Sequence, residues 1–409
     1  MQWESLGFKG NPFSTDPIVQ STLPLYAGRR KIVKTCNSIL QEKSILLVIE
    51  GARGVGTTSF ANYLRFSAQE RREHFTPNNE IRVGPGWSLE TLLAAIIANV
   101  VREIELSLSN KTIKEKAFQD AKALSMRIAD TYRSFGIEAF GFGVNYGKSA
   151  GIASQPIIVP SAVLGHHLED LGKLVQIAGY KYGILLQLNN LDVGEIHEGN
   201  HLKYLFNELR DYIQTDNISW LFVGDIGLRR FIAQHVDRLD DIISYDITIE
   251  SLTKAEYQEL INKRIDFYKN HERAKLPIDN EVFLYLLDLT KGRLRYVFGL
   301  IKRLLNELFV GDLVDRLTLD IVKPMVIKLA KERLTKHSLT SGEEEILSVL
   351  VKMKDSTATD LSKHLNKTRQ QVSKILVKLA EIKLLEVKQQ GIYRIYVPTL
   401  DAIIAYSSK

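Results

Sequence analysis

The chain has 409 residues, 45% of them hydrophobic and 25% charged, which allows two or three globular domains. The formal net charge of +6 permits binding to nucleic acid without demanding it. No apolar run reaches the roughly 20 residues that span a membrane, and the N-terminus has no signal-peptide pattern. A single cysteine, Cys36, excludes an internal disulfide and a cysteine-based zinc cluster, so we expect a cytoplasmic protein with no membrane partner.

A glycine-rich loop follows the first apolar run of the chain. Residues 44–49 predict a buried parallel strand, and residues 51–58 then fit the Walker A pattern G-x-x-x-x-G-K-[ST], except that Thr57 replaces the lysine. In this pattern, backbone N–H groups and the start of the following helix bind the phosphates of a nucleotide. The Thr58 hydroxyl is also placed to bind Mg²⁺. The residues expected at the nucleotide are Gly51, Arg53, Gly54, Val55, Gly56, Thr57 and Thr58.

A change of composition follows the next helices. Residues 88–134 have apolar side chains at helical spacing, whereas residues 135–160 are rich in glycine and serine. We expect an inserted glycine-rich hairpin near 138–155 that contacts DNA or a neighbouring subunit through stacking and charge, or else a surface loop that packs on itself. The side chains available for such contacts are Phe140, Phe142, Tyr146 and Lys148.

The second buried strand ends without the acidic residues of a nucleotide hydrolase. Residues 182–188 predict this strand, and Asn189 and Asn190 follow where a Walker B strand carries the acidic pair that anchors Mg²⁺. An amide binds a metal weakly through its oxygen, but it brings no charge and cannot act as a base. Asp192 contributes to Mg²⁺ binding only if the loop after the strand folds back. Otherwise its side chain stabilises that loop.

Thr57 and the two asparagines together predict slow or absent hydrolysis. Losing the lysine removes a charge-assisted hydrogen bond worth about 1.5–3 kcal/mol and the charge that stabilises phosphoryl transfer. Arg53 is the candidate that could replace this charge. We expect ATP or ADP as the cofactor with weakened Mg²⁺ binding, and an empty site is the alternative.

The remaining elements define three domains. A third buried strand at 219–223 completes an alternation of strands and helices, which predicts a three-layer α/β P-loop domain with a parallel sheet. Residues 253–335 contain helices only, and a polar linker follows them. We expect the P-loop core with its inserted hairpin at 1–250, a helical lid domain at 251–337 and a winged helix at 338–409.

The final unit has the element order of a winged helix-turn-helix: three helices and a two-stranded wing. The third helix, from Thr368 to about Ile382, has a basic and amide-rich face, which is typical of contact with phosphates and base edges. We expect double-stranded DNA as the partner, while a protein-docking module and a merely solvated face are the alternatives. The expected DNA contacts are Lys367, Thr368, Arg369, Gln370, Gln371, Ser373, Lys374, Lys378, Lys388 and Arg394.

These features, in this order, resemble AAA+ ATPases of the origin-recognition and replication-initiator type and the related STAND-like ATPases. The resemblance covers nearly the whole chain and rests on the order of its motifs. The matching segments are Asn11-Pro12-Phe13, Tyr26 to Arg29, residues 51–58, residues 189–192, Leu221 to Asp225, Gly292 to Arg295 and the winged helix.

The resemblance implies further site residues. Gly28 and Arg29 are expected near the adenine, and Asp225 near the γ-phosphate, where the family commonly has a neutral residue. Arg295 corresponds to the sensor-2 arginine, and Arg238 lies where a neighbouring subunit's arginine finger is expected. Each arginine is otherwise part of a surface or interdomain salt bridge. The sequence assigns no catalytic residue, and the candidates for that role are Asn189, Asn190 and Arg238.

We therefore expect a DNA-binding, initiator-like or regulatory AAA+ protein with a degenerate nucleotide site. It would act as a nucleotide-sensing scaffold or switch, with a protein partner or as a homo-oligomer, in a mobile-element, plasmid or phage-defence system. One alternative is an active ATP-hydrolysing loader on DNA. Another is a signalling or assembly protein whose winged helix binds protein.

Overall fold

The computed structural model describes residues 3–134, 159–192, 196–310, 316–390 and 393–406. It divides into two units, Thr15–Tyr268 and Met1–Ser14 with Lys269–Lys409. The domain limits expected at 250 and 337 stay a prediction. The hairpin expected at 138–155, with Phe140, Phe142, Tyr146 and Lys148, lies outside the described residues.

A five-stranded parallel sheet forms the centre of the unit Thr15–Tyr268. Its strand order is β2-β3-β4-β1-β5, and every neighbouring pair runs parallel. The strands are β1 (Leu46–Gly51), β2 (Ile81–Arg82), β3 (Ile184–Asn189), β4 (Ile218–Gly224) and β5 (Tyr245–Ile249). This arrangement confirms the predicted three-layer α/β fold with a parallel sheet.

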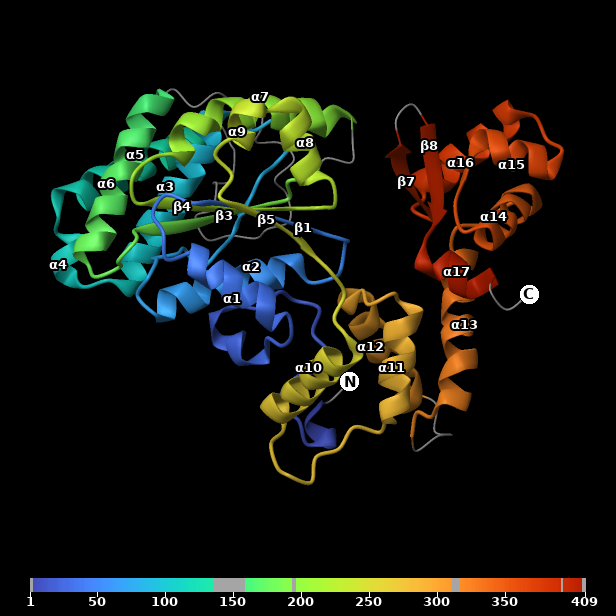
Figure 1. Ribbon diagram of the computed structural model, residues 1–409. Coiled ribbons are helices and arrows are strands. Elements are labelled where there is room, and N and C mark those ends of the chain that lie inside the picture. The colour runs from blue at the N-terminus through green and yellow to red at the C-terminus, as the bar shows by residue number, and fades with distance from the viewer. Residues whose placement is uncertain (1–2, 135–158, 193–195, 311–315, 391–392, 407–409) are drawn as a thin grey trace. The chain divides into compact units, whose positions relative to one another are not determined.

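Helices cover both faces of this sheet because successive residues of each strand point to opposite sides (Figure 1). Leu47 and Ile49 of β1 pack with α1 (Arg30–Ile39) and α2 (Thr57–Glu70), whereas Leu46 and Val48 pack with the helices of the other face. The other elements of the unit are η2 (Gln20–Leu25), α3 (Leu89–Ser107), α4 (Asn110–Ile113), α5 (Lys116–Ser134), α6 (Ser161–Ile177), α7 (Ile196–Ile213), α8 (Leu228–His235), α9 (Asp237–Asp240) and α10 (Lys254–Tyr268).

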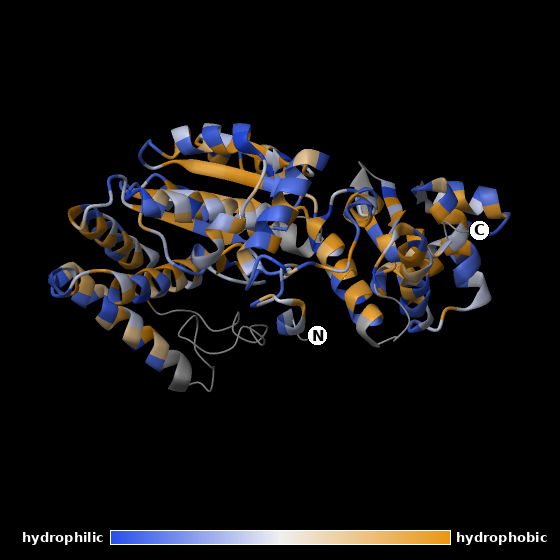
Figure 2. Ribbon diagram, turned by 90° about the horizontal axis from the view of Figure 1, so that it is seen from below, coloured by the Kyte–Doolittle hydropathy of each residue, from blue (hydrophilic) through white to orange (hydrophobic). Residues whose placement is uncertain are grey.

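The central strands β1, β3 and β4 are mostly apolar and buried on both faces, as expected for a sheet covered on two sides. Figure 2 shows them as hydrophobic ribbons between helices that alternate hydrophobic and hydrophilic positions. Among the helices that the structure describes, none combines the length and apolarity that a membrane crossing needs.

The other unit contains helices that continue into the winged helix. Asn11-Pro12-Phe13 anchors the N-terminal segment, since the ring of Phe13 lies 5.9 Å from that of Phe283 and 6.0 Å from that of Phe298. The elements before the winged helix are η1 (Trp3–Leu6), α11 (Asn280–Leu289), α12 (Leu294–Val310) and α13 (Leu319–Thr335).

The winged helix contains the three predicted helices and the predicted wing. A short strand, β6, joins the wing to form an antiparallel sheet of order β6-β8-β7, and a last helix, α17, packs against α13 and α14. Neither β6 nor α17 was expected from the sequence. The elements are α14 (Ser341–Met353), β6 (Ser356–Thr357), α15 (Ala358–Leu365), α16 (Arg369–Glu381), β7 (Leu385–Gln390), β8 (Tyr393–Pro398) and α17 (Leu400–Tyr406).

One buried histidine links the end of α1 to the sheet. His74 is fully buried, and its Nε2 lies 2.7 Å from the carbonyl oxygen of Leu40, so the neutral ring donates a hydrogen bond there. Burial lowers the pKa of His74 to about 4, against a usual value near 6.5.

We expect the protein to lose stability as the pH falls below about 6.5. Between the two pKa values only the unfolded chain takes up the proton, so the contribution of His74 is complete above pH 6.5 and is lost toward pH 4. The free energy of unfolding should fall by about 2 kcal/mol from this source between pH 7 and pH 5. Urea unfolding at both pH values measures it. His74→Gln is the control, and an equal pH dependence in both proteins would contradict the assignment.

Candidate nucleotide site and nucleic-acid interface

The glycine loop keeps the backbone shape of a phosphate-binding loop. Gly54 and Gly56 have φ angles of 88° and 104°, which side chains disfavour, and Gly56 is the N-cap of α2. Gly51 is needed for a different reason: a Cβ there would lie 2.7 Å from Thr57 Oγ1 and 3.1 Å from the carbonyl oxygen of Ile249. The loop therefore presents its N–H groups at the start of a 14-residue helix, a suitable position for an anion.

Polar side chains inside the loop bring little charge to this position. The Thr57 hydroxyl lies over Gly51, and its short side chain cannot reach where a lysine ammonium would extend. Thr58 is half-buried on the first turn of α2, next to the loop. Arg53 is exposed, and it makes no ion pair within the described residues.

Arg29 supports the loop from behind. Its guanidinium donates hydrogen bonds to the carbonyl oxygen of Val55, at 3.0 Å, and to that of Glu250, at 2.8 and 3.2 Å. The backbone N–H of Arg29 donates to Glu256 Oε1 at 2.5 Å. Burial raises the pKa of Glu256, but hydrogen bonds from Thr253 and Arg29 outweigh this effect and hold it below its usual value. Arg29 thus ties the loop to the end of β5 and to α10.

A pocket of about 390 Å³ lies beside Gly28, where the resemblance places the adenine. Helices α1, α2 and α10 all contribute to its lining. The rings of Tyr26 and Tyr63 stack at its side, with centroids 4.0 Å apart. Gly28 has a φ of 80°, and a Cβ there would lie 2.7 Å from the Leu252 side chain. The position accepts only glycine without a shift of its neighbours.

Asn189 faces the same side of the sheet as the glycine loop's helix. Leu185 packs with α2, and alternation along β3 puts Gln187 and Asn189 on that same face. Asn189 is buried, and its Oδ1 accepts a hydrogen bond of 3.0 Å from Gln187 Nε2. Gln187 Oε1 is buried without a hydrogen-bond partner in the described part of the chain. The amide oxygen of Asn189 therefore already accepts one of the two hydrogen bonds that it can accept.

The residues after Asn189 turn away from this position. Asn190 has a φ of 63° and an exposed side chain, and with Asp192 it lines another pocket, of about 270 Å³, beside His201. Within the described ranges, no three His, Cys, Asp or Glu side chains come together as a metal site.

Glu50 is a site residue that the sequence did not reveal. It ends the apolar part of β1 just before the loop, and its Oε2 accepts hydrogen bonds of 3.0 Å from the N–H groups of Gly227 and Arg229 at the start of α8. Its Oε1 accepts one of 3.2 Å from the Thr248 hydroxyl. Asp225, expected near the γ-phosphate, is half-buried in the turn that Glu50 secures. The only sign of this role in the sequence is that a charged residue, Glu50, ends an otherwise apolar run.

The two arginines expected to act on phosphate differ in their surroundings. Arg238 is exposed on α9 and makes no ion pair within the ranges that the structure describes. Arg295 is exposed on α12, in the other unit. Its neighbour Arg293 pairs with Glu386 of the wing strand β7, with 2.9 Å between Nη1 and Oε1. This link between the residue that precedes α12 and the wing was not expected from the sequence.

Several expected DNA contacts have structural partners within the winged helix. Thr368 and Gln371 form the capping box that begins α16, each accepting a hydrogen bond from the backbone of the other. Lys378 pairs with Glu343 Oε1 at 2.5 Å, and Lys367 pairs with Glu345. The bond from Lys378 holds the pKa of Glu343 below its usual value. These side chains support the fold and, in this arrangement, have less charge to offer a phosphate.

The remaining contacts form an exposed polar surface. Arg369, Gln370 and Lys374 are exposed on α16, and Ser373 beside them is half-buried. Arg394 is exposed on the wing strand β8. Lys388 lies on β7, and its side chain is outside the described part of the structure. We call Arg369, Gln370, Lys374 and Arg394 the polar face.

Comparison with known proteins supports the fold of both units. A family model described as the sugar-specific transcriptional regulator TrmB matches residues 334–400, which include the winged helix from α14 to β8. No curated protein sequence gives a significant match to the chain.

Solved structures match over nearly the whole chain. The Aeropyrum pernix ORC2 protein with ADPNP and ADP has a TM-score of 0.51 at 13% identity, with 98% of each chain covered. Its ADP form has a TM-score of 0.50 at 14% identity, covering 97% of this chain and 96% of that one. The Aeropyrum pernix ORC1 protein with DNA has a TM-score of 0.46 at 14% identity, covering 94% and 93%. The chain thus has the AAA+ fold of ORC proteins, and the predicted resemblance is confirmed for the fold.

Arg29→Ala should lower the free energy of unfolding by about 2–3 kcal/mol, because it leaves the carbonyl groups of Val55 and Glu250 without their donor. Arg30→Ala is the matched control. The Arg30 side chain is 82% exposed and, among the described residues, pairs with Glu259 at the surface, so its loss should cost no more than about 1 kcal/mol. Urea unfolding of the two variants distinguishes them, and equal losses would contradict the support that we assign to Arg29.

Proposed function

We propose that the protein binds ATP or ADP at the glycine loop and duplex DNA through the polar face of its winged helix. In this proposal it acts as a scaffold or switch on DNA and hydrolyses nucleotide slowly or not at all. The proposed DNA binding rests on the polar face. Its side chains are exposed, whereas the neighbouring Lys367 and Lys378 pair with glutamates.

Nucleotide binding is supported by the loop and by its relatives. The positive φ angles of Gly54 and Gly56 preserve the anion-binding backbone at the start of α2. The ORC2 protein that shares this fold was solved with ADPNP and ADP. The pocket beside Gly28 and the stacked Tyr26 and Tyr63 give the base a place next to this unit's loop.

Weak hydrolysis follows from the groups that meet the phosphates. Thr57 supplies no charge, and the Asn189 oxygen already accepts a bond from Gln187. Phosphoryl transfer depends on charge placed against the transferring group, so both changes remove transition-state stabilisation. We further propose that any assembly driven by nucleotide is homo-oligomeric, with the exposed Arg238 reaching a neighbouring subunit.

DNA binding is supported by the match of residues 334–400 to a transcriptional-regulator family and by the chemistry of α16. Exposed arginine and lysine side chains contact phosphates, while glutamine can pair with adenine in the major groove. A winged helix that docks on protein would need no such concentration of cations and amides.

Nucleotide binding without turnover is the first test. Isothermal titration should show ADP and ATP binding to the wild-type chain, while phosphate release stays near background. Thr57→Lys should tighten binding about tenfold or more, since it restores a charge-assisted hydrogen bond. The further change Asn189→Asp should bring measurable hydrolysis. Wild-type turnover near 1 s⁻¹ that Thr58→Ala abolishes would exclude the weak-hydrolysis proposal.

Charge reversal on the polar face is the second test. Arg369→Glu with Lys374→Glu should weaken binding to a random duplex about a hundredfold or more and lower the salt dependence by about two counterions. Fluorescence anisotropy at several salt concentrations measures both effects. Lys331→Glu with Lys352→Glu removes the same charge from exposed positions of α13 and α14 and is the control. Undiminished binding by the first variant would show that α16 is not the DNA-binding element.

A further inference from the structure

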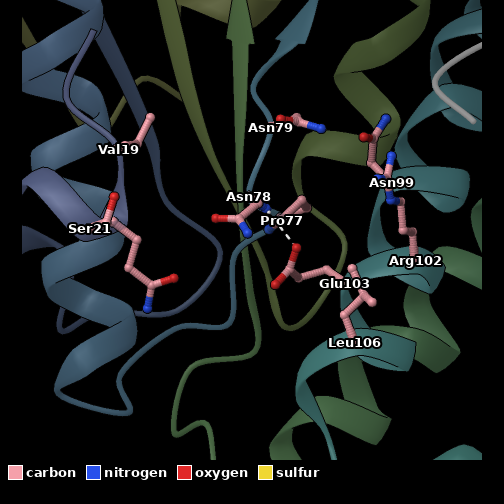
Figure 3. Close-up of a pocket in the computed structure, with 10 residues that line it drawn as sticks. Val19, Ser21, Pro77, Asn78, Asn79, Asn99, Arg102, Glu103 and Leu106 are labelled. Carbon is pink, nitrogen blue, oxygen red and sulfur yellow. Dashed lines mark hydrogen bonds between the residues drawn. The ribbon is translucent and has the colours of Figure 1, made fainter. Parts of the chain in front are cut away.

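Buried carboxylates of this protein hold other segments of the chain in place. Beside a pocket of about 650 Å³ between η2, the loop at 77–79 and α3, Glu103 accepts a hydrogen bond of 3.0 Å from the Asn78 N–H (Figure 3). In the winged helix, the buried Glu343 of α14 instead pairs with the Lys378 side chain of α16. Glu103 fixes a backbone group, whereas Glu343 engages a cation of the helix that carries most of the polar face.

The lysines that pair with α14 lie at the two ends of the polar face. Gln370, Lys374 and Lys378 follow one another at four-residue spacing, so they lie along one side of α16. Lys367 precedes the N-cap residue of this helix, and its N–H donates a hydrogen bond of 3.1 Å to the carbonyl oxygen of Ser362, which fixes it beside the first turn. Lys367 and Lys378 therefore flank the exposed side chains of Gln370 and Lys374 along the helix.

Glutamates in the first turns of α14 engage both of these lysines. Lys378 Nζ lies 2.5 Å from Glu343 Oε1, and Lys367 Nζ pairs with the carboxylate of Glu345. The other oxygen of Glu343, Oε2, accepts a hydrogen bond of 2.9 Å from the Thr340 N–H, as part of the capping box that begins α14. The cap therefore holds the Glu343 carboxylate in place beside α16.

These ion pairs reduce what the two lysines contribute to DNA binding. A lysine that contacts a phosphate of duplex DNA releases counterions, which adds about 0.9 to the slope of log K against log salt concentration. The side chains of Lys378 and Lys367 are 54% and 31% exposed, so a phosphate can reach both. Each lysine must then leave its glutamate, and the freed carboxylate repels the phosphate backbone. The net gain from each contact is therefore smaller than the gain from an unpaired lysine.

We propose that Glu343 and Glu345 restrain the non-specific binding of the winged helix to DNA, because they compete with phosphate for Lys378 and Lys367. They lower the sequence-independent, electrostatic part of the affinity and leave unchanged the part that arises from contacts with base edges. The two carboxylates thereby raise the selectivity of α16 without contacting DNA themselves. The inference rests on the DNA binding proposed above and extends it by assigning a role to α14.

Fluorescence anisotropy of the full chain with a random duplex, at several salt concentrations, tests this competition. Glu345→Gln removes the charge that pairs with Lys367 and keeps a side chain of the same size. It should tighten binding about three- to tenfold and raise the salt dependence by about one counterion. Glu343→Gln should have the same effect through Lys378, and it keeps the capping box, in which glutamine serves as well as glutamate.

Glu344→Gln is the matched control. It removes the same charge from the same turn of α14, but the exposed Glu344 makes no ion pair within the described residues, so no lysine is released. Its affinity and salt dependence should stay close to those of the wild type. Addition of Lys367→Gln to Glu345→Gln should cancel the gain of the single variant, because the lysine that the substitution released is then missing.

Two outcomes would overturn this inference alone. One is that the wild type binds the duplex, while Glu343→Gln and Glu345→Gln gain neither affinity nor salt dependence. The other is that Glu344→Gln gains as much as Glu345→Gln, which would show a general effect of negative charge instead of competition for a lysine. If the wild type and all of these variants fail to bind the duplex, the proposed DNA binding is overturned together with this inference.

Discussion

The parallel alignment of β1, β3 and β4 is the constraint on which the candidate nucleotide site depends. Because Glu50 lies opposite Gly224, and Leu188 opposite Phe222, the three strands end at one edge of the sheet. Residues from three distant parts of the sequence therefore meet there: the glycine loop after β1, Asn189 at the end of β3 and Asp225 after β4. Ligands of open α/β sheets bind at the carboxyl ends of strands for this geometric reason.

At this edge, several polar groups of the protein form hydrogen bonds with one another. The Arg29 guanidinium bonds to loop and strand carbonyls, and the Asn189 oxygen accepts from Gln187. Glu50 occupies the N–H groups at the start of α8. These polar contacts hold the turns of the protein itself. The turns of the site are therefore tied by contacts within the protein, which is consistent with the scaffold role proposed above.

Local sequence patterns predicted the fold class and the strands β1, β3 and β4, but not β2 or β5, and they predicted the site only in part. Apolar runs followed by glycine turns or asparagines marked the strands and the loop, because burial and turn chemistry depend on neighbouring residues. The roles of Arg29 and Glu50 were not predictable in this way, since their partners lie 221 and 177 positions away. Lys367 and Lys378 show the same limit: composition marked them as cations, but their pairing with α14 depends on how two helices pack.

Glu50 also acts as a tethered competitor. Because the carboxylate belongs to β1, it meets the Gly227 and Arg229 N–H groups at an effective concentration set by the chain, about millimolar or more, which dilution cannot reduce. A free phosphate binds to the start of α8 only if it displaces the Glu50 carboxylate, which the chain holds in place. The turn between β4 and α8 is therefore held by a carboxylate of the same chain, whatever the concentration of a free anion.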